Sequence, residues 1–213
     1  MRGKAFLHRV SESQGLPEGL AIRGGTIPAS VFDHKEMDLH MAGPKLTFDT
    51  NAFLNLFDKS SQTATSVEEL EALLQLGLSG RAEISITTRT ELDIGRDKNV
   101  DRRASMLQLL NMMPVIGSVF RLGISCLGSD ILTDSEQKID VKIQQIVFPG
   151  LTTSDRRYAN KQNDIDHLAA HYLNSRDVFV TDDKELLQKR EPLMSSLGIK
   201  LMNPREALEL LRR

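Results

Sequence analysis

The sequence predicts an α/β fold built around a parallel sheet. From residue 45 onward, short apolar runs alternate with segments whose apolar residues recur at helical spacing, a pattern typical of strand–helix–strand units. Acidic residues follow several of the apolar runs, at the edge where the carboxyl ends of parallel strands meet. The 213 residues, of which 40% are hydrophobic and 26% charged, suffice to bury a core without disulfide bonds.

The expected elements follow from these runs in chain order. Strands are predicted at residues 45–49, 83–87, 178–181 and 199–202. Helices are predicted at residues 50–57, after the capping residue Ser66, at residues 101–113, before Pro149, and at residues 164–173, 183–189 and 204–211. The last of these carries Pro204 in its first turn, where the N–H that proline lacks would have no helical partner.

The first 43 residues differ from the rest of the chain. Glycine and proline are frequent there, and two short extended runs flank Gly24 and Gly25, which predicts a β-hairpin. We therefore expect an N-terminal extension at residues 1–43 and a main domain at residues 44–213. The hairpin either packs on the main domain or serves as a regulatory or dimerising appendage.

The composition favours a cytoplasmic protein. The single cysteine, Cys126, cannot form an internal disulfide, which fits a reducing compartment. No apolar run approaches the length of a membrane span, and the basic N-terminus lacks the long apolar centre of a secretory signal. The net charge of −2 neither favours nor excludes a nucleic-acid partner, because a nuclease keeps acids at its metal and basic residues on the flanks.

Carboxylates recur wherever the chain returns to one edge of the predicted sheet. They are Asp49, Glu91, Asp164, Asp166, Asp182 and Asp183. A buried acid is costly unless it is paired or bound to a metal. Several carboxylates without a matching cluster of histidine or cysteine are the ligands of a hard divalent cation such as Mg²⁺. An ion held by few carboxylates keeps open positions, which suits phosphate chemistry.

Each acid also has a structural explanation. Asp49 and Asp182 are favoured helix caps, and Glu91 stands in a first helical turn, where the helix dipole stabilises an acid. Helical geometry does not choose between Asp164 and Asp166, which flank the apolar face of their helix about equally. A metal site is therefore predicted only from the acids taken together, since each one alone has a structural explanation.

Two histidines, His167 and His171, stand four residues apart, as metal-binding pairs on helices do. The residues between them are apolar, so the glutamate of an HExxH zinc motif is missing, and no third zinc ligand is evident. We expect these histidines to be solvated or to support the acids rather than to bind zinc.

Five segments of the chain together resemble the PIN domain family. They read KLTFDTNAFLNLF, ITTRTEL, NDIDHLAAHYL, FVTDDKELL and GIKLMNPREALELL. The resemblance covers the chain from Lys45 to its end and implies a Rossmann-like, three-layer α/β/α fold with metal-dependent nuclease activity, usually on RNA. Two features depart from compact members such as the VapC-type toxins: the long stretch at residues 117–161 and the first 43 residues.

The resemblance implies a role for particular residues. The catalytic and metal-binding quartet would be Asp49, Glu91, Asp164 and Asp183, with Asp166 and Asp182 as further metal ligands. Asn51 and Thr181 match supporting positions, and one or two Mg²⁺ or Mn²⁺ ions are the implied cofactors. Asp183 matches better than Asp182 because the family has threonine, any residue, then aspartate.

Basic residues near these acids are candidate contacts to the substrate backbone. They are Arg89, Arg156, Arg157 and Lys184. Each of them equally fits a solvated charged surface. Because the chain has no tryptophan, we expect recognition of backbone shape rather than extended base stacking.

We therefore expect a metal-dependent endoribonuclease that hydrolyses RNA phosphodiester bonds and leaves a 3′-hydroxyl and a 5′-phosphate, as the resemblance implies. A toxin-type or RNA-processing role would bring an antitoxin or regulatory protein as partner, and relatives often form homodimers. The alternatives are a catalytically quiet domain that binds RNA or protein and another Mg²⁺-dependent phosphate hydrolase. A phosphatase with Asp49 as nucleophile would want a second aspartate two residues on, where Asn51 stands.

Overall fold

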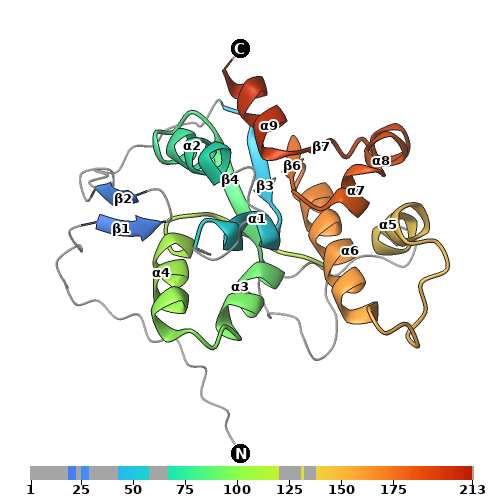
Figure 1. Cartoon of the computed structure of the whole chain (residues 1–213). Helices are drawn as coiled ribbons and strands as arrows, with labels where there is room; N and C mark the ends of the chain where they lie inside the picture. Colours follow the sequence, from blue (N-terminus) through green and yellow to red (C-terminus); the bar gives the residue numbers. More distant parts are fainter. Residues whose placement is uncertain are drawn as a thin grey trace, which may run out of the picture.

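In this computed structural model, five parallel strands form the central sheet (Figure 1). They are β3 (Lys45–Phe48), β4 (Glu83–Thr87), β5 (Val115–Ile116), β6 (Val178–Val180) and β7 (Leu201–Met202). Their order across the sheet is β5-β4-β3-β6-β7, and every neighbouring pair is parallel. The structure describes residues 43–57, 67–119, 131 and 138–212, together with the backbone of residues 19–22 and 25–28.

The chain changes its direction of travel across the sheet between β3 and β6. From β3 it proceeds through β4 to β5 at one edge, and it then returns to β6 on the other side of β3. Loops that leave β3 and β6 therefore part in opposite directions. In open parallel sheets, ligands bind at such a switch point, outside the carboxyl ends of the strands.

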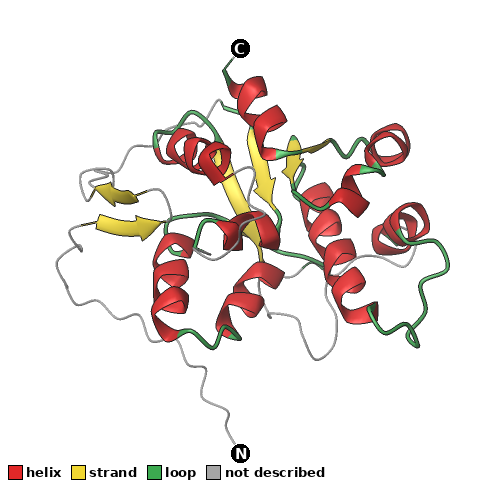
Figure 2. Ribbon diagram, in the orientation of Figure 1, coloured by secondary structure: helices red, strands yellow, loops and turns green. Residues whose placement is uncertain are grey.

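Helices cover both faces of this sheet (Figure 2). They are α1 (Thr50–Asn55), α2 (Val67–Leu78), α3 (Thr88–Gly95), α4 (Val100–Leu110), α5 (Ile139–Val147), α6 (Tyr158–Leu173), α7 (Lys184–Leu187), α8 (Arg190–Leu197) and α9 (Pro204–Leu211). One apolar core joins the sheet to α1, α2, α3, α4 and α9, and a second joins it to α5, α6, α7 and α8. The predicted three-layer α/β/α fold is thereby confirmed.

The alternation of side chains along β6 shows how one strand serves both cores. Val178 and Val180 pack in the first core, while Phe179 between them packs in the second. All three side chains are at most 1% exposed. A strand buried on both faces reads as a continuous apolar run in the sequence, as VFV does.

The helix ends follow local rules. In α9, the Asn203 side chain accepts from the Glu206 N–H at 2.9 Å, and Glu206 accepts from the Asn203 N–H at 2.9 Å, which completes a capping box. Pro204 occupies the first helical position, as predicted. α8 ends at Gly198, whose φ of 71° lies in the left-handed region that only glycine adopts without strain.

Several boundaries differ from those that the sequence predicts. α6 begins at Tyr158 rather than at residue 164. The sequence did not predict this earlier start, because the first turns of the helix are polar and show no apolar period. Asp164 and Asp166 therefore lie in the body of the helix and not in its first turn. β5 and α8 were not expected: β5 is too short to alternate, and α8 contains Pro192, which its first turn tolerates.

The N-terminal strands β1 (Gly19–Ile22) and β2 (Gly25–Pro28) form the predicted hairpin, in which Leu20 stands opposite Ile27. β1 lies beside α4 (Figure 1). The boundary between the extension and the main domain stays a prediction, and Ser66 and Cys126 lie outside the described residues. Within the described ranges, no helix combines the length and the apolar character that crossing a bilayer requires.

Candidate metal centre

Asp49 lies at the carboxyl end of β3, beside β6. Its backbone N–H donates to the carbonyl oxygen of Val180 at 2.9 Å, which extends the pairing of the two strands by one residue. Its side chain is buried, and its Oδ2 accepts a hydrogen bond from the Thr181 hydroxyl at 2.8 Å. Because Asp49 also serves as the N-cap residue of α1, one residue both closes the strand and starts the helix. The carboxylate is thus fixed at the switch point.

Burial raises the pKa of Asp49 to about 6. The negative charges of Asp183 and Asp182 raise this pKa further, whereas hydrogen bonding by the Thr181 hydroxyl and the Thr50 backbone lowers it. The carboxyl therefore has a pKa of about 6 instead of its ordinary value of 3.8. A cation beside it would favour the charged form and lower its pKa.

Asp164 brings a second carboxyl to the same place from α6. Burial is the main cause that raises its pKa, to about 8, and the charges of Asp49, Asp183 and Glu185 add to the effect. The positive charge of Arg157 acts in the opposite direction. Asp164 is thus mostly protonated at neutral pH when no cation is near, because burial and the neighbouring acids both disfavour its charged form.

Asp183 is held at the start of α7 by backbone groups. Its Oδ1 accepts from the N–H of Glu185 at 2.7 Å and of Leu186 at 3.1 Å, which makes it the N-cap of the helix. Its own N–H donates to the Thr181 hydroxyl oxygen at 3.0 Å. The alternative that Asp182 caps this helix is therefore wrong. The Thr181 hydroxyl connects Asp183 to Asp49.

We call Asp49, Asp164, Asp182, Asp183 and Glu185 the acidic cluster. Its members come from three places in the chain: the end of β3, the body of α6, and the segment from β6 into α7. The charges of the other members raise the pKa of Asp49 or Asp164. The cluster therefore gathers carboxyl groups at the switch point between β3 and β6, where they oppose one another's ionisation.

The donor set of the acidic cluster fits Mg²⁺ or Mn²⁺. In the described part of the chain, no three His, Cys, Asp or Glu side chains are already arranged as a metal-binding group. Mg²⁺ binds through one or two carboxylates and keeps several waters, so it does not need such a preformed group. The raised pKa values of Asp49 and Asp164 indicate that their charges are poorly compensated by the protein alone. A hard cation would supply the missing positive charge.

Three predicted site residues lie on the surface near the sheet edge. Glu91 is exposed in the first turn of α3 and is not among the charges that shift the pKa of Asp49 or Asp164. Asn51 is exposed in the first turn of α1, and Lys184 is exposed as the first residue of α7. The structure thus joins Asp49, Asp164 and Asp183 more closely than it joins the fourth member of the expected quartet.

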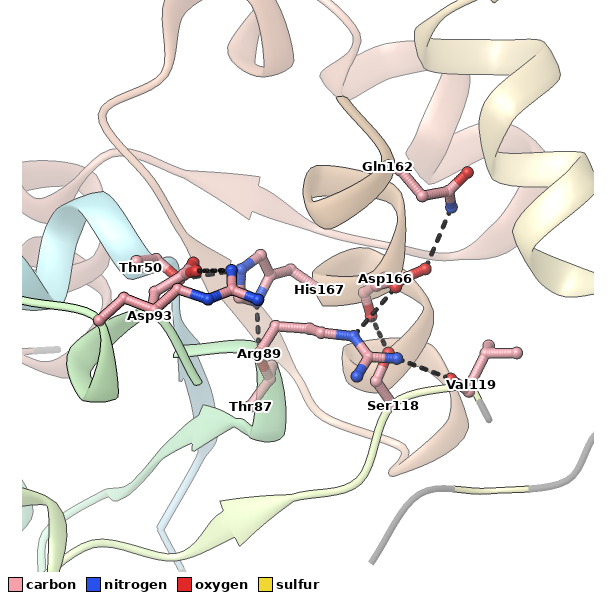
Figure 3. Close-up of polar contacts among 10 residues, drawn as sticks. Thr50, Thr87, Arg89, Asp93, Ser118, Val119, Gln162, Asp166 and His167 are labelled. Carbon is pink, nitrogen blue, oxygen red and sulfur yellow. Dashed lines mark hydrogen bonds and ion pairs between the residues drawn. The ribbon is translucent and has the colours of Figure 1, made fainter. Parts of the chain in front are cut away.

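Arg89 and Asp166 form an ion pair in the interior (Figure 3). Arg89 Nε lies 3.0 Å from Asp166 Oδ2, and the two side chains are 2% and 0% exposed. A second guanidinium nitrogen, Nη2, donates to the Val119 carbonyl at 3.0 Å, and Gln162 Nε2 donates to Asp166 Oδ1 at 3.1 Å. These contacts correct two expectations: Arg89 is buried instead of facing a substrate, and Asp166 is paired with Arg89 instead of joining the acidic cluster.

Two buried histidines connect α6 to the sheet. His167 lies 2.9 Å from the Thr50 hydroxyl through Nε2 and 2.6 Å from the Thr87 hydroxyl through Nδ1 (Figure 3). His171 Nδ1 lies 3.1 Å from the Thr47 hydroxyl. Burial lowers the pKa of both histidines to about 3, so both are neutral. Neither histidine is solvated. His167 holds α6 against α1 and the end of β4, and His171 holds it against β3.

Glu185 and the pairing of Thr50 with His167 were not predicted from the sequence. Glu185 follows Asp183 by two residues, and only the placement of α7 beside α6 reveals its effect on Asp164. His167 lies three residues after Asp164, so one turn of α6 separates the buried anchor from the acid. A histidine within an apolar helical face was the available signal, because such a residue needs polar partners.

Arg156 and Arg157 are exposed in the turn that leads into α6, and Arg157 lies close enough to Asp164 to lower its pKa. They remain candidates for substrate contacts. In comparisons with known proteins, no protein-family model matches the chain and no curated protein matches it.

Proposed function

We propose that this protein is a divalent-cation-dependent endoribonuclease whose ion is held by the acidic cluster. The observation that carries the proposal is the approach of Asp49 and Asp164, from β3 and α6, at the switch point of a parallel sheet. The charge of one raises the pKa of the other, and Asp183 acts on both. Helix capping explains Asp49 and Asp183 one at a time, but it gives no reason for Asp164 to lie beside them.

In the proposed reaction, Asp49 and Asp164 are the residues that would hold the ion, with Asp183 beside them. When bound, the ion would activate a water molecule and stabilise negative charge on the scissile phosphate. Thr181 orients Asp49, because its single hydroxyl proton is donated to Asp49 Oδ2 while its oxygen accepts the Asp183 N–H. Arg157 would place positive charge next to a phosphate at Asp164.

The test uses a labelled mixed RNA incubated with the full chain in Mn²⁺, in Mg²⁺ and in EDTA. We expect cleavage only with a cation and none by the Asp49→Asn/Asp164→Asn variant. Asp101→Asn/Asp140→Asn is the matched control, since it removes two aspartates from the first turns of α4 and α5 and should cleave as the wild type does.

Three results would contradict the proposal. Equal cleavage by the cluster variant and the wild type would mean that the acidic cluster is not the active site. Absence of both cleavage and Mn²⁺ binding by calorimetry would leave a domain that binds RNA or protein without catalysis. A phosphoaspartate trapped at Asp49 would instead identify another type of phosphate hydrolase.

Glu91 is tested separately with Glu91→Gln. Because Glu91 is exposed on α3, whereas Asp49 is buried at the end of β3, we expect this change to lower the cleavage rate less than Asp49→Asn does. A loss equal to that of Asp49→Asn would assign Glu91 to the ion as well.

A toxin-type role and a processing role differ in their effect on the cell. A toxin would arrest growth on expression, and Asp49→Asn would relieve the arrest. Relief by a co-expressed small protein would identify an antitoxin as partner. A processing nuclease would be tolerated, and its loss would leave a specific RNA uncut.

A further inference from the structure

A groove lies between the end of α5, the loop into α6 and helix α7. Its volume is about 580 Å³, and the residues that line it include Phe148, Arg156, Arg157, Lys161, Glu185 and Lys189. The stretch that forms most of it, residues 147–161, falls within the part of the chain that is longer than in compact PIN domains. None of the acids predicted as metal ligands lines the groove.

The groove carries an excess of positive charge. Four basic side chains line it, against the acids Asp155 and Glu185. Lys161 Nζ lies 3.4 Å from Glu185 Oε1, and Asp155 accepts from the Thr152 N–H at 2.7 Å, so both acids are engaged locally. Arg156 is exposed and forms no ion pair with any residue described. Its charge is therefore available to an anion.

The groove continues into the acidic cluster. Lys161 precedes Asp164 by three residues on α6, which places the two side chains as neighbours along one side of the helix. Glu185 lines the groove and its N–H binds Asp183 Oδ1 at 2.7 Å. The groove and the acidic cluster thus share residues of α6 and α7, and Glu185 belongs to both.

The floor of the groove does not offer a surface for base stacking. Phe148 is 5% exposed, and Lys161 Nζ already lies over its ring at 4.5 Å from the centroid. Apart from the two acids and the amide of Gln188, the polar side chains that line the groove are cationic, and cationic side chains bind phosphates without regard to sequence. A strand held here would turn its backbone to the protein and its bases to solvent.

We propose that this groove binds the sugar–phosphate backbone of a single-stranded nucleic acid, next to the phosphate that reaches the acidic cluster. The inference rests on the proposed function for its substrate. It adds the path of the strand and predicts weak dependence on base sequence, because no base edge is read.

The test measures binding of a fluorescein-labelled single-stranded RNA to the full chain by anisotropy, in EDTA so that no cleavage occurs. Arg156→Gln/Lys189→Gln removes two groove cations. The matched control, Lys142→Gln/Arg212→Gln, removes two exposed cations outside the groove. We expect the groove variant to bind several-fold more weakly than the control, and the slope of log K against log salt to fall by about 1.4, or 0.7 for each lost phosphate contact.

Binding and cleavage fail in distinguishable ways. If the groove variant binds as the control does, the groove proposal is overturned even when the wild type cleaves RNA. If the wild type binds through the groove but never cleaves, the groove stands and the nuclease proposal fails. Tighter binding of polyglutamate than of RNA, lost in the same variant, would overturn the nucleic-acid assignment in favour of an acidic protein.

Discussion

Asp49 and Asp164 are acids whose ionisation the fold opposes. Their pKa values, about 6 and about 8, exceed the ordinary value of 3.8, so the folded chain binds more protons than the unfolded chain between these limits. The free energy of unfolding therefore falls as the pH rises from about 4 to about 8 through these two groups. A bound cation reverses this effect, because it stabilises the charged carboxylates that burial disfavours.

Asp164→Asn should accordingly stabilise the protein in EDTA at pH 8, near the pKa of Asp164. We expect a gain of about 2 kcal/mol, below the full value of about 1.4 kcal/mol per pKa unit because the carboxyl is only partly buried. Thermal unfolding followed by circular dichroism measures the gain. Mn²⁺ should raise the Tm of the wild type but not that of the variant, and a variant less stable than the wild type in EDTA would contradict this account.

The buried ion pair of Arg89 and Asp166 should contribute to the stability of the core. Arg89→Met leaves the Asp166 carboxylate buried without its guanidinium and should lower the free energy of unfolding by about 3 to 5 kcal/mol. The double variant Arg89→Met/Asp166→Leu should recover much of this loss, because it removes both charges. Urea denaturation provides the measurement.

The control for this pair is Arg96→Met, which breaks the exposed pair of Arg96 and Asp93 and should cost less than about 1 kcal/mol. If Arg89→Met cost no more than this control, the pair would not contribute to the core as described. The substrate-contact interpretation of Arg89 would then return.

At the scale of elements, close packing of α2 on β4 depends on Gly77. A Cβ at this position would lie 2.7 Å from Ile84 Cδ1 and 3.0 Å from Cγ1. Alanine favours a helix over glycine by about 1 kcal/mol, but overpacking a core costs about 1 to 3 kcal/mol. We expect the clash to outweigh the gain in helix propensity, because Ile84 is 4% exposed and has little room to move.

Gly77→Ala should therefore destabilise the protein, and Gly77→Ala/Ile84→Val should be more stable than the two separate losses imply. Gly95→Ala is the control: its Cβ would meet nothing within 4 Å at the end of α3, so it should be neutral or stabilising. Chemical denaturation of the four proteins gives the coupling. An additive result would show that α2 and β4 are less tightly packed than described.

Helices and strands with a clear sequence pattern could be predicted, and those without one could not. β4 and α9 have the predicted bounds, because a run of buried residues or a capping box marks them. β5 and the first turns of α6 could not be predicted, since a two-residue strand and a polar helix start lack periodicity. Likewise, Asp49 and Asp183 were locatable from strand ends, but the choice between Asp164 and Asp166 required Arg89 to be placed.

At the scale of the whole molecule, the buried histidines and the buried aspartates have opposite effects on how the free energy of unfolding changes with pH in acid. His167 and His171 stay neutral to about pH 3 when folded but gain protons near pH 6.5 when unfolded. Through them, stability is present above about pH 6.5 and falls as the pH falls toward 3. Asp49 and Asp164 contribute the opposite slope between about pH 4 and 6, so the two effects nearly cancel.

Removing the aspartates should expose the histidine effect. In Asp49→Asn/Asp164→Asn, the free energy of unfolding should fall by about 2.7 kcal/mol per pH unit between pH 6 and 4, which is about 1.4 for each histidine. The wild type in EDTA should change far less over the same range. Urea denaturation at several pH values measures both slopes, and parallel curves would refute the assignment of these four groups.

Helix α6 is the feature with the widest consequence. One rigid element carries Asp164 toward the acidic cluster, Asp166 to Arg89, His167 to Thr50 and Thr87, and His171 to Thr47. No part of its central turns can therefore open while the rest stays in place. The amide protons of these central turns should exchange with deuterium only when the whole molecule unfolds, so that the lifetime of the site equals the lifetime of the fold.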